Sequence, residues 1–217
     1  MSMTLPNGSQ LALATMSAMK AVTDISNGVA PAVSAAGHGL LAKAPFLLES
    51  GWSRLNGRVW RPSAIQADSF MLEGISTADE SKFPDGSGSG TLHGVASWTE
   101  LTQQLEVTMS GGDPSYWSYS FLEDPDGQEM QMPTGKSAMA ITVSLGDDPS
   151  LPWYETLSEA DEDKSVRVLR CRLPSGGVIY YPVRTAFNKT PRLVKNQGMA
   201  VTAAFPLAGG FTRYAAA

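Results

Sequence analysis

The chain has 217 residues, 42% of them hydrophobic and 17% charged, with a formal net charge of −5 at pH 7. This length fits one large or two small domains, and the charged fraction lies below the ~25% that is usual for soluble domains. The surplus of uncharged surface indicates association with other chains. The single cysteine, Cys171, excludes an internal disulfide framework, and its place on the apolar face of a predicted strand predicts a core residue.

No apolar run is long enough to cross a bilayer, and the first eight residues lack the charged and apolar regions of a signal peptide. The cysteine content gives no sign of secretion either. We therefore expect a soluble protein that is made in a cytoplasm and has no membrane partner.

The first 90 residues divide into three predicted parts. Residues 1–25 contain two apolar runs, which predict N-terminal strands that join the main sheet. Residues 26–78 alternate short apolar runs with turn residues at roughly ten-residue spacing, which is typical of a small β-module. Residues 79–90 are rich in Gly and Ser and predict a loop. No Lys-Ser/Thr pair follows these glycines and no helix opens there, which excludes a phosphate-binding loop.

Residues 91–217 predict the main β-sandwich. Strict alternation of apolar and polar residues over 101–109 and over 139–145 predicts two strands, the first with one solvated face. Between them, 117–121 predicts a further strand, and the acidic, Pro- and Gly-bearing stretch 123–135 predicts a long loop. Because such loops in compact domains are usually functional or disordered, we expect 123–135 to be an arm that contacts a neighbouring subunit. The candidate contact residues are Glu123, Asp124, Asp126, Glu129, Met130 and Met132.

One helix is predicted, over residues 151–160. Pro152 suits its first turn, Ser150 is a candidate N-cap, and Trp153 with Leu157 gives it an apolar stripe. Four acids follow at its C-terminal end, where the helix dipole disfavours negative charge. They are either solvated or paired with a basic segment such as the one that follows.

Residues 165–205 predict a β-meander with a C-terminal arm beyond it. A hairpin with a Gly-containing turn joins 166–173 to 178–187, and a third strand covers 199–205. Pro182 cannot donate a ladder hydrogen bond, so we expect it at an edge or a bulge. Altogether the sequence predicts a mainly β fold, namely a sandwich or barrel of antiparallel strands with one flanking α-helix, a small N-terminal β-module and extended loops.

Charge is segregated along the chain. Residues 164–217 contain no acid, whereas residues 73–163 contain only two basic residues, Lys82 and Lys136. The two blocks either pair within one fold or form head-to-tail contacts between copies. A nucleic-acid surface is disfavoured because the aromatic residues of the basic block alternate into the predicted core. The candidate charge-complementary contacts are Glu159, Asp161, Glu162, Asp163, Arg167, Arg170, Arg172 and Arg184.

Signatures of catalysis are scarce. Neither histidine, His38 or His93, has a carboxylate or cysteine at a metal-ligand spacing, and there is no Gly-x-Ser-x-Gly elbow. The number of acidic residues alone does not exclude a glycosidase that uses a pair of carboxylates. We expect no enzymatic activity, no metal and no cofactor.

A series of short motifs, in this order, resembles the major tail tube proteins of long, non-contractile-tailed phages. They cover nearly the whole chain: Asn27, Gly37-His-Gly-Leu40, 51–57, 70–75, Phe83-Pro-Asp-Gly86, 98–102, Ser110-Gly-Gly112, 119–124, Lys136-Ser137, 147–152 and Thr212-Arg-Tyr214. The resemblance implies a structural virion protein whose hexameric rings stack into a hollow tube for DNA passage. The Gly-His-Gly stretch also resembles a small β-module of other phage tail proteins, so a tail fibre or a receptor- or carbohydrate-binding module is the alternative.

The resemblance also implies partners and a location. The partners are further copies of the chain, other tail proteins (tape measure, terminators and distal tail proteins) and, transiently, the passing DNA. The location is the virion tail, after assembly in the host cytoplasm. A ring of six such chains carries roughly −30, and like charge in a narrow bore repels DNA, so we expect the tube to conduct DNA without binding it.

Overall fold

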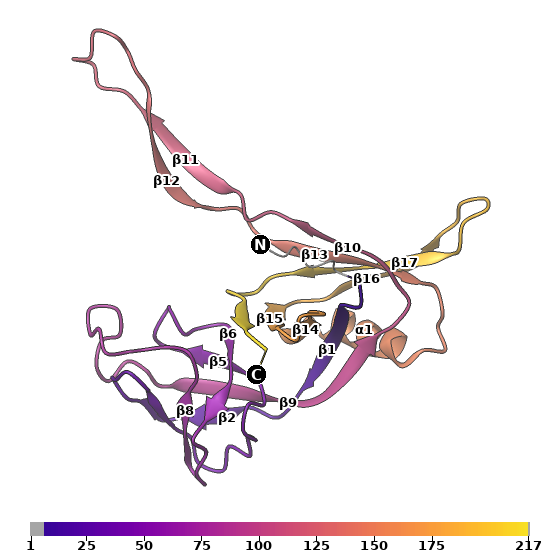
Figure 1. Ribbon diagram of the computed structural model, residues 1–217, viewed down its shortest axis with the longest axis horizontal. Coiled ribbons are helices and arrows are strands. Elements are labelled where there is room, and N and C mark those ends of the chain that lie inside the picture. The colour runs from indigo at the N-terminus through magenta and orange to yellow at the C-terminus, as the bar shows by residue number, and fades with distance from the viewer. Residues whose placement is uncertain (1–6, 217) are drawn as a thin grey trace.

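The computed structural model describes residues 7–216, so the start of the predicted N-terminal segment lies outside the described part. Antiparallel strands and one helix build the described chain, which confirms the predicted fold class (Figure 1). Eight strands form the largest sheet. Its path runs β18 (Thr212–Tyr214), β15 (Val178–Val183), β14 (Arg167–Arg172), β1 (Gln10–Met16), β9 (Gly90–Leu101), β5 (Phe46–Ser50) and β6 (Arg58–Trp60), with β2 (Lys20–Val22) pairing to β9.

The two ends of this sheet approach each other, so that it nearly closes into a barrel. The Thr212 hydroxyl in β18 donates to the carbonyl of Val59 in β6 at 2.6 Å, and the Tyr214 hydroxyl accepts from the N–H of Arg61 at 3.1 Å. Alternate residues of each strand point inward. They form a buried cluster of Ala14, Leu47, Val59, Val168 and Tyr180.

Two arginines stack on aromatic rings beside this cluster. The guanidinium carbon of Arg61 lies 4.2 Å from the Tyr214 ring centroid, and that of Arg170 lies 4.3 Å from the Trp98 ring. Arg170 also pairs with Glu100. A stacked guanidinium retains its charge while its flat faces are buried. Burial raises the pKa of the Tyr214 hydroxyl to about 12, so this residue is neutral at physiological pH.

A four-stranded sheet packs on one side of the barrel, and together they form the predicted sandwich. Its order is β10 (Gln104–Ser110), β13 (Ala140–Gly146), β17 (Ala200–Pro206) and β16 (Ala186–Arg192). The sandwich core combines barrel residues such as Leu13 and Leu169 with sheet residues such as Val143, Ala203 and Phe205. Because β10 and β16 are the outer strands, the sheet has one unpaired edge on each side.

The helix α1 (Pro152–Asp163) fills one end of this core. Trp153, Leu157 and Ala160 are buried, which confirms the predicted stripe. Ser150 is not its N-cap, because the Ser150 hydroxyl donates to the Asp148 carboxylate at 2.6 Å and no side chain caps the helix. The helix ends at Asp163, three residues beyond the predicted end. Ion pairs of its last acids with the residues that follow offset the unfavourable dipole.

The predicted meander is wrong in one respect. Strands β14 and β15 form the predicted hairpin in the barrel, but after Val183 the chain crosses over and continues as β16 in the four-stranded sheet. Pro182 lies in β15 beyond the short stretch that pairs with β18, and its carbonyl accepts from the N–H of Ala208 instead. The missing N–H of Pro182 therefore interrupts no ladder, as predicted for an edge position.

A second four-stranded sheet, in the order β3 (Asp24–Ile25), β4 (Ala32–Ser34), β8 (Ser69–Leu72) and β7 (Pro62–Ser63), forms the small N-terminal unit. Its core contains Val33, Phe70 and Trp52. The predicted strands near 46 and 59, β5 and β6, belong to the barrel sheet instead. The long strand β9 joins the two units, because its first half contributes Leu92 to the core of the small unit and its last residue, Leu101, belongs to the sandwich core.

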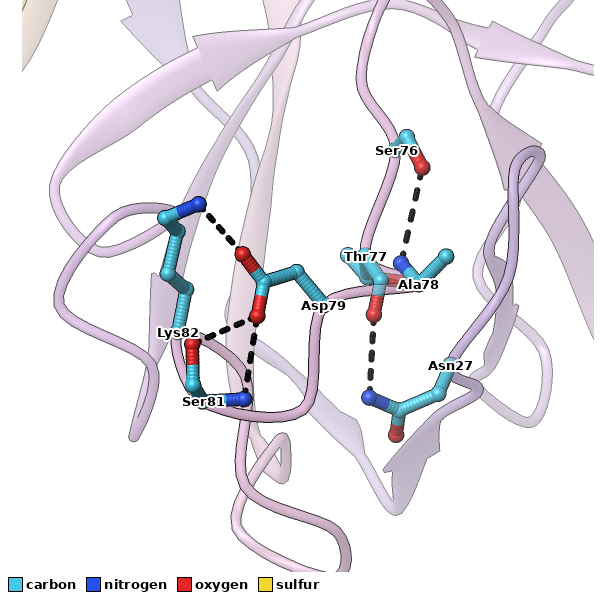
Figure 2. A network of polar contacts seen from close by, with 7 residues as sticks. All are labelled: Asn27, Ser76, Thr77, Ala78, Asp79, Ser81 and Lys82. Atoms are coloured by element: carbon cyan, nitrogen blue, oxygen red, sulfur yellow. Dashed lines mark hydrogen bonds and ion pairs between the residues drawn. The ribbon is translucent and has the colours of Figure 1, made fainter.

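The predicted loop after this unit is held by side chains that bond to its backbone (Figure 2). The Asn27 amide donates to the carbonyls of Thr77 and Phe83, at 2.9 and 2.8 Å. Asp79 accepts from Ser81 and Lys82 within the loop. The Trp52 indole N–H donates to the Pro84 carbonyl at 2.8 Å. The stretch is therefore a fixed loop on the small unit.

Candidate assembly surfaces

A two-stranded hairpin projects from the body of the molecule and contains every residue of the predicted contact arm. It consists of β11 (Pro114–Tyr119) and β12 (Met130–Lys136), and Figure 1 shows it extending away from the end of the four-stranded sheet. The prediction of a loop over 123–135 is wrong for 130–135, which pair with β11. The loop itself is the hairpin tip, residues 120–129. We call residues 111–139 the arm.

One face of the arm is apolar. The rings of Trp117 and Tyr119 stack with centroids 5.0 Å apart, and Phe121 meets Tyr119 edge to face at 5.5 Å. Met132 lies opposite Trp117 and Met130 opposite Tyr119 in the ladder, so all five side chains share this face. Trp117 is 57% exposed and Met132 50% exposed. Isolated two-stranded hairpins are marginally stable in water, so this face is suited to burial against another chain.

The arm tip is acidic and built by tight turns. Asp124 accepts the backbone N–H of Asp126 at 3.1 Å, and its own carbonyl accepts from Gly127. Glu123, Asp126 and Glu129 are exposed. Leu122 is fully exposed beside them. The tip thus combines negative charge with uncovered apolar side chains.

A second uncovered apolar row lies on the edge strand β10. Leu105, Val107 and Met109 point to the sandwich side of the sheet, yet they are 64%, 44% and 55% exposed. The barrel does not extend far enough to cover them, and together with Leu11 and Leu173 they line a groove between the two layers. The prediction of one strand over 101–109 is wrong at its start, because Leu101 ends β9 and β10 begins at Gln104. Alternation identified Leu105, Val107 and Met109 as apolar, but it could not show that they lack a cover within the subunit.

The opposite end of the four-stranded sheet is basic. The arm leaves the sheet where Ser110 pairs with Ala140, whereas the β16–β17 connection leaves it at the far end, where Arg192 pairs with Ala200. We call residues 189–199 the basic tip. It contains Lys189, Arg192 and Lys195 and no acid, and Leu193 and Met199 are 74% and 54% exposed. The predicted third strand starts one residue too early, because β17 begins at Ala200 and Met199 lies outside it.

Most of the candidate charge-complementary residues pair within the subunit. Asp161 bonds Lys164, Asp163 bonds Arg167, Glu162 approaches Lys189 at 3.6 Å, and Arg170 bonds Glu100. The hydrogen bond from Lys164 holds the pKa of Asp161 below its usual value. Arg184 donates to the carbonyl of Lys164. These contacts occupy Asp161, Glu162 and Asp163 without a neighbouring copy.

The outward face of the four-stranded sheet is small, hydroxylated and almost uncharged. It presents Thr108, Thr142, Ser144 and Thr202 together with alanines, and its side chains are exposed or half-buried. Its charged groups, Glu106 and Arg192, are opposite in sign. This face therefore offers DNA phosphates little net attraction or repulsion.

The histidines show no catalytic arrangement. The His38 ring is buried, with Nδ1 accepting from the Leu40 N–H at 3.1 Å and Nε2 within 2.9 Å of the Gln66 carbonyl. His93 lies in β9 opposite Leu47. Within residues 7–216 no group of three His, Cys, Asp or Glu side chains could hold a metal ion, and no helix there has the length and apolar character to cross a membrane.

Comparison with known proteins finds a protein family and several similar solved structures, among them two gene transfer agent particles. The first structure is the virion of a native gene transfer agent particle, at 13% identity and a TM-score of 0.43, covering 54% of this chain and 89% of that chain. The second is the tail of an empty gene transfer agent particle with C6 symmetry, at 14% identity and a TM-score of 0.44, covering 54% of this chain and 87% of that chain. Both likenesses are too distant to support an argument about this chain. No curated protein matches. The profile of the phage tail tube protein family (TTP) matches residues 50–216, and the chain belongs to this family.

Proposed function

We propose that copies of this chain form hexameric rings that stack into the hollow tube of a phage tail and conduct DNA during ejection. The family gives the chain a structural role in the tail. Six is the number of subunits that the sequence resemblance implies. Assembly would take place in the host cytoplasm, together with tape measure, terminator and distal tail proteins.

The projecting arm is the observation that carries this proposal. A hairpin with an aromatic face, exposed on both sides in the single subunit, gains its stability from another molecule. In a tube this molecule is a neighbouring copy, and the contact residues are those at the tip and on β12: Glu123, Asp124, Asp126, Glu129, Met130 and Met132.

Lateral contacts within a ring would use the two edges of the four-stranded sheet. Strand β10 presents unpaired backbone groups and the uncovered row of Leu105, Val107 and Met109, and β16 presents the other edge. Joining β10 of one copy to β16 of the next is a head-to-tail contact, which closes into a ring when the rotation fits. The hydroxylated face would then line the bore, and DNA would slide past it without being held.

We propose that the chain has no enzymatic activity, in keeping with a structural family. The alternative, a fibre or carbohydrate-binding module, requires a monomer or a small oligomer that binds a glycan.

Light scattering and negative-stain imaging over a concentration series test the proposal. We expect rings or tubes with a central bore. A strictly monomeric protein at every concentration would contradict it, and binding to a surface glycan would favour the fibre module. Replacing residues 114–136 by an Asn-Gly turn should leave the subunit folded and abolish tubes, because the arm contributes no residue to the three buried clusters.

A further inference from the structure

We infer that the acidic arm tip of one copy binds the basic tip of a second copy in the next ring, so that one specific contact joins successive rings. The inference rests on the proposed function and names the surface that receives the arm.

The placement comes from the strand register. The arm leaves the four-stranded sheet at the Ser110–Ala140 end, and the basic tip leaves it at the Arg192–Ala200 end. Figure 1 shows the two projecting from opposite ends of the same sheet. A contact between the arm of one copy and the basic tip of another joins two different surfaces and is therefore heterologous. Because the two surfaces lie at opposite ends of the sheet, repetition of this contact gives an open filament.

The charges are complementary. The arm tip contains four acids between 123 and 129 and no basic residue. The basic tip contains Lys189, Arg192 and Lys195 and no acid. Arg192 and Lys195 are exposed and make no ion pair in the described part of the chain, whereas Asp161, Glu162 and Asp163 of α1 have partners within the subunit. Both tips therefore offer exposed charge of one sign, negative on the arm tip and positive on the basic tip.

Both tips also carry uncovered apolar side chains, which makes each more than a patch of charge. Phe121 and Leu122 project beside the acids, at 57% and 104% exposure. Leu193 and Val194 flank Lys195, at 74% and 37% exposure. Apolar contact supplies affinity, and opposite charge supplies orientation and speeds encounter.

Charge reversal with restoration tests the contact. D126K/E129K and R192E/K195E should each raise the critical concentration for tube formation by roughly tenfold. The chain with all four substitutions should return to within about threefold of the wild type. Asp124 is left unchanged because it builds the tip turn. The matched control is E80K/D85K, which reverses two exposed acids on the small unit and should assemble normally.

A cross-link makes the result independent of tube formation. Mixed chains carrying D126C and K195C should form a disulfide heterodimer at high concentration, whereas chains with E80C and K195C should not. The inference would be overturned if the wild-type chain forms tubes but the chain with all four substitutions does not regain assembly and no cross-link forms. The proposed function would then still stand. A cross-link without tubes would support the contact and count against the tube. Assembly of R192E/K195E at the wild-type critical concentration would also overturn the inference.

Discussion

Replacing Gly111 by alanine should abolish tube formation by redirecting the arm. Gly111 lies at the base of the arm with φ of +79°, and a Cβ at this position would lie 1.9 Å from the carbonyl oxygen of Ala138. Real Cβ atoms essentially never come closer than 3.0 Å to another heavy atom, so this carbonyl must retreat by at least 1.1 Å (3.0 less 1.9). Alanine in a left-handed conformation adds a cost of about 1–2 kcal/mol.

The displacement grows along the hairpin. Paired strands lie about 4.8 Å apart, so a shift of this size at one strand base tilts the arm by roughly 13°. The seven residues of β12 extend over about 24 Å at ~3.4 Å per residue, and the tilt therefore moves the arm tip by about 5 Å. Such a shift exceeds the length of a hydrogen bond, so contacts of the tip with a neighbouring copy should be lost.

Negative-stain imaging and light scattering measure tube formation, and thermal unfolding of the unassembled chain tests the fold. The melting temperature should fall by only about 2–8 °C, as expected from about 1–2 kcal/mol of local strain, since the arm lies outside the buried clusters. G135A is the matched control, because a Cβ at Gly135 meets no atom within 4 Å. Normal tubes from G111A at the wild-type critical concentration would refute the reasoning.

Three further predictions concern the core, the loop and DNA. Trp153→Ala should lower the free energy of unfolding by about 3–5 kcal/mol in denaturant titrations, whereas Trp117→Ala in the exposed arm should change it by less than ~0.5 kcal/mol; equal effects would show that the arm packs on the subunit. Hydrogen bonds from Lys82 and Ser81 lower the pKa of Asp79 from its ordinary value of 3.8 to about 2. The stability that this carboxylate contributes is therefore fully present above pH 3.8 and is lost as the pH falls towards 2. In Lys82→Ala, NMR titration should find the pKa of Asp79 closer to its ordinary value, and an unchanged pKa would exclude the lysine as its main cause. Duplex DNA should show no mobility shift near 0.15 M salt, and micromolar binding that persists there would make the basic tip a nucleic-acid site.

Local patterns predicted much of the fold. Alternation correctly predicted β13 and the β14–β15 hairpin, and the stripe of Trp153 and Leu157 predicted the helix. The crossing from β15 to β16 was not predictable, because Tyr181 and Phe187 contribute to one core from two different layers. Alternation reports which face is apolar but not to which sheet a strand belongs.

The candidate site was predictable in position but not in form. Acids, Pro125 and Gly127 indicated the arm, but Pro133 and Gly135 also disfavour strands, so β12 was not recognised. Pairing with β11 overrides these preferences. The uncovered state of Leu105 and Met109 depends on where the barrel ends, which only the tertiary structure shows.

The long strand β9 has a mechanical consequence. Its residue Leu92 lies in the core of the small unit and Leu101 in the sandwich core, while hydrogen bonds to β5, β2 and β1 hold it along its length, so one uninterrupted backbone passes from the small unit into the sandwich. A connection of this kind resists bending, unlike a flexible linker between two bodies. Force applied to the small unit would be transmitted as shear along several ladder hydrogen bonds at once. A tail built from such stiff subunits would have to bend at the joints between them.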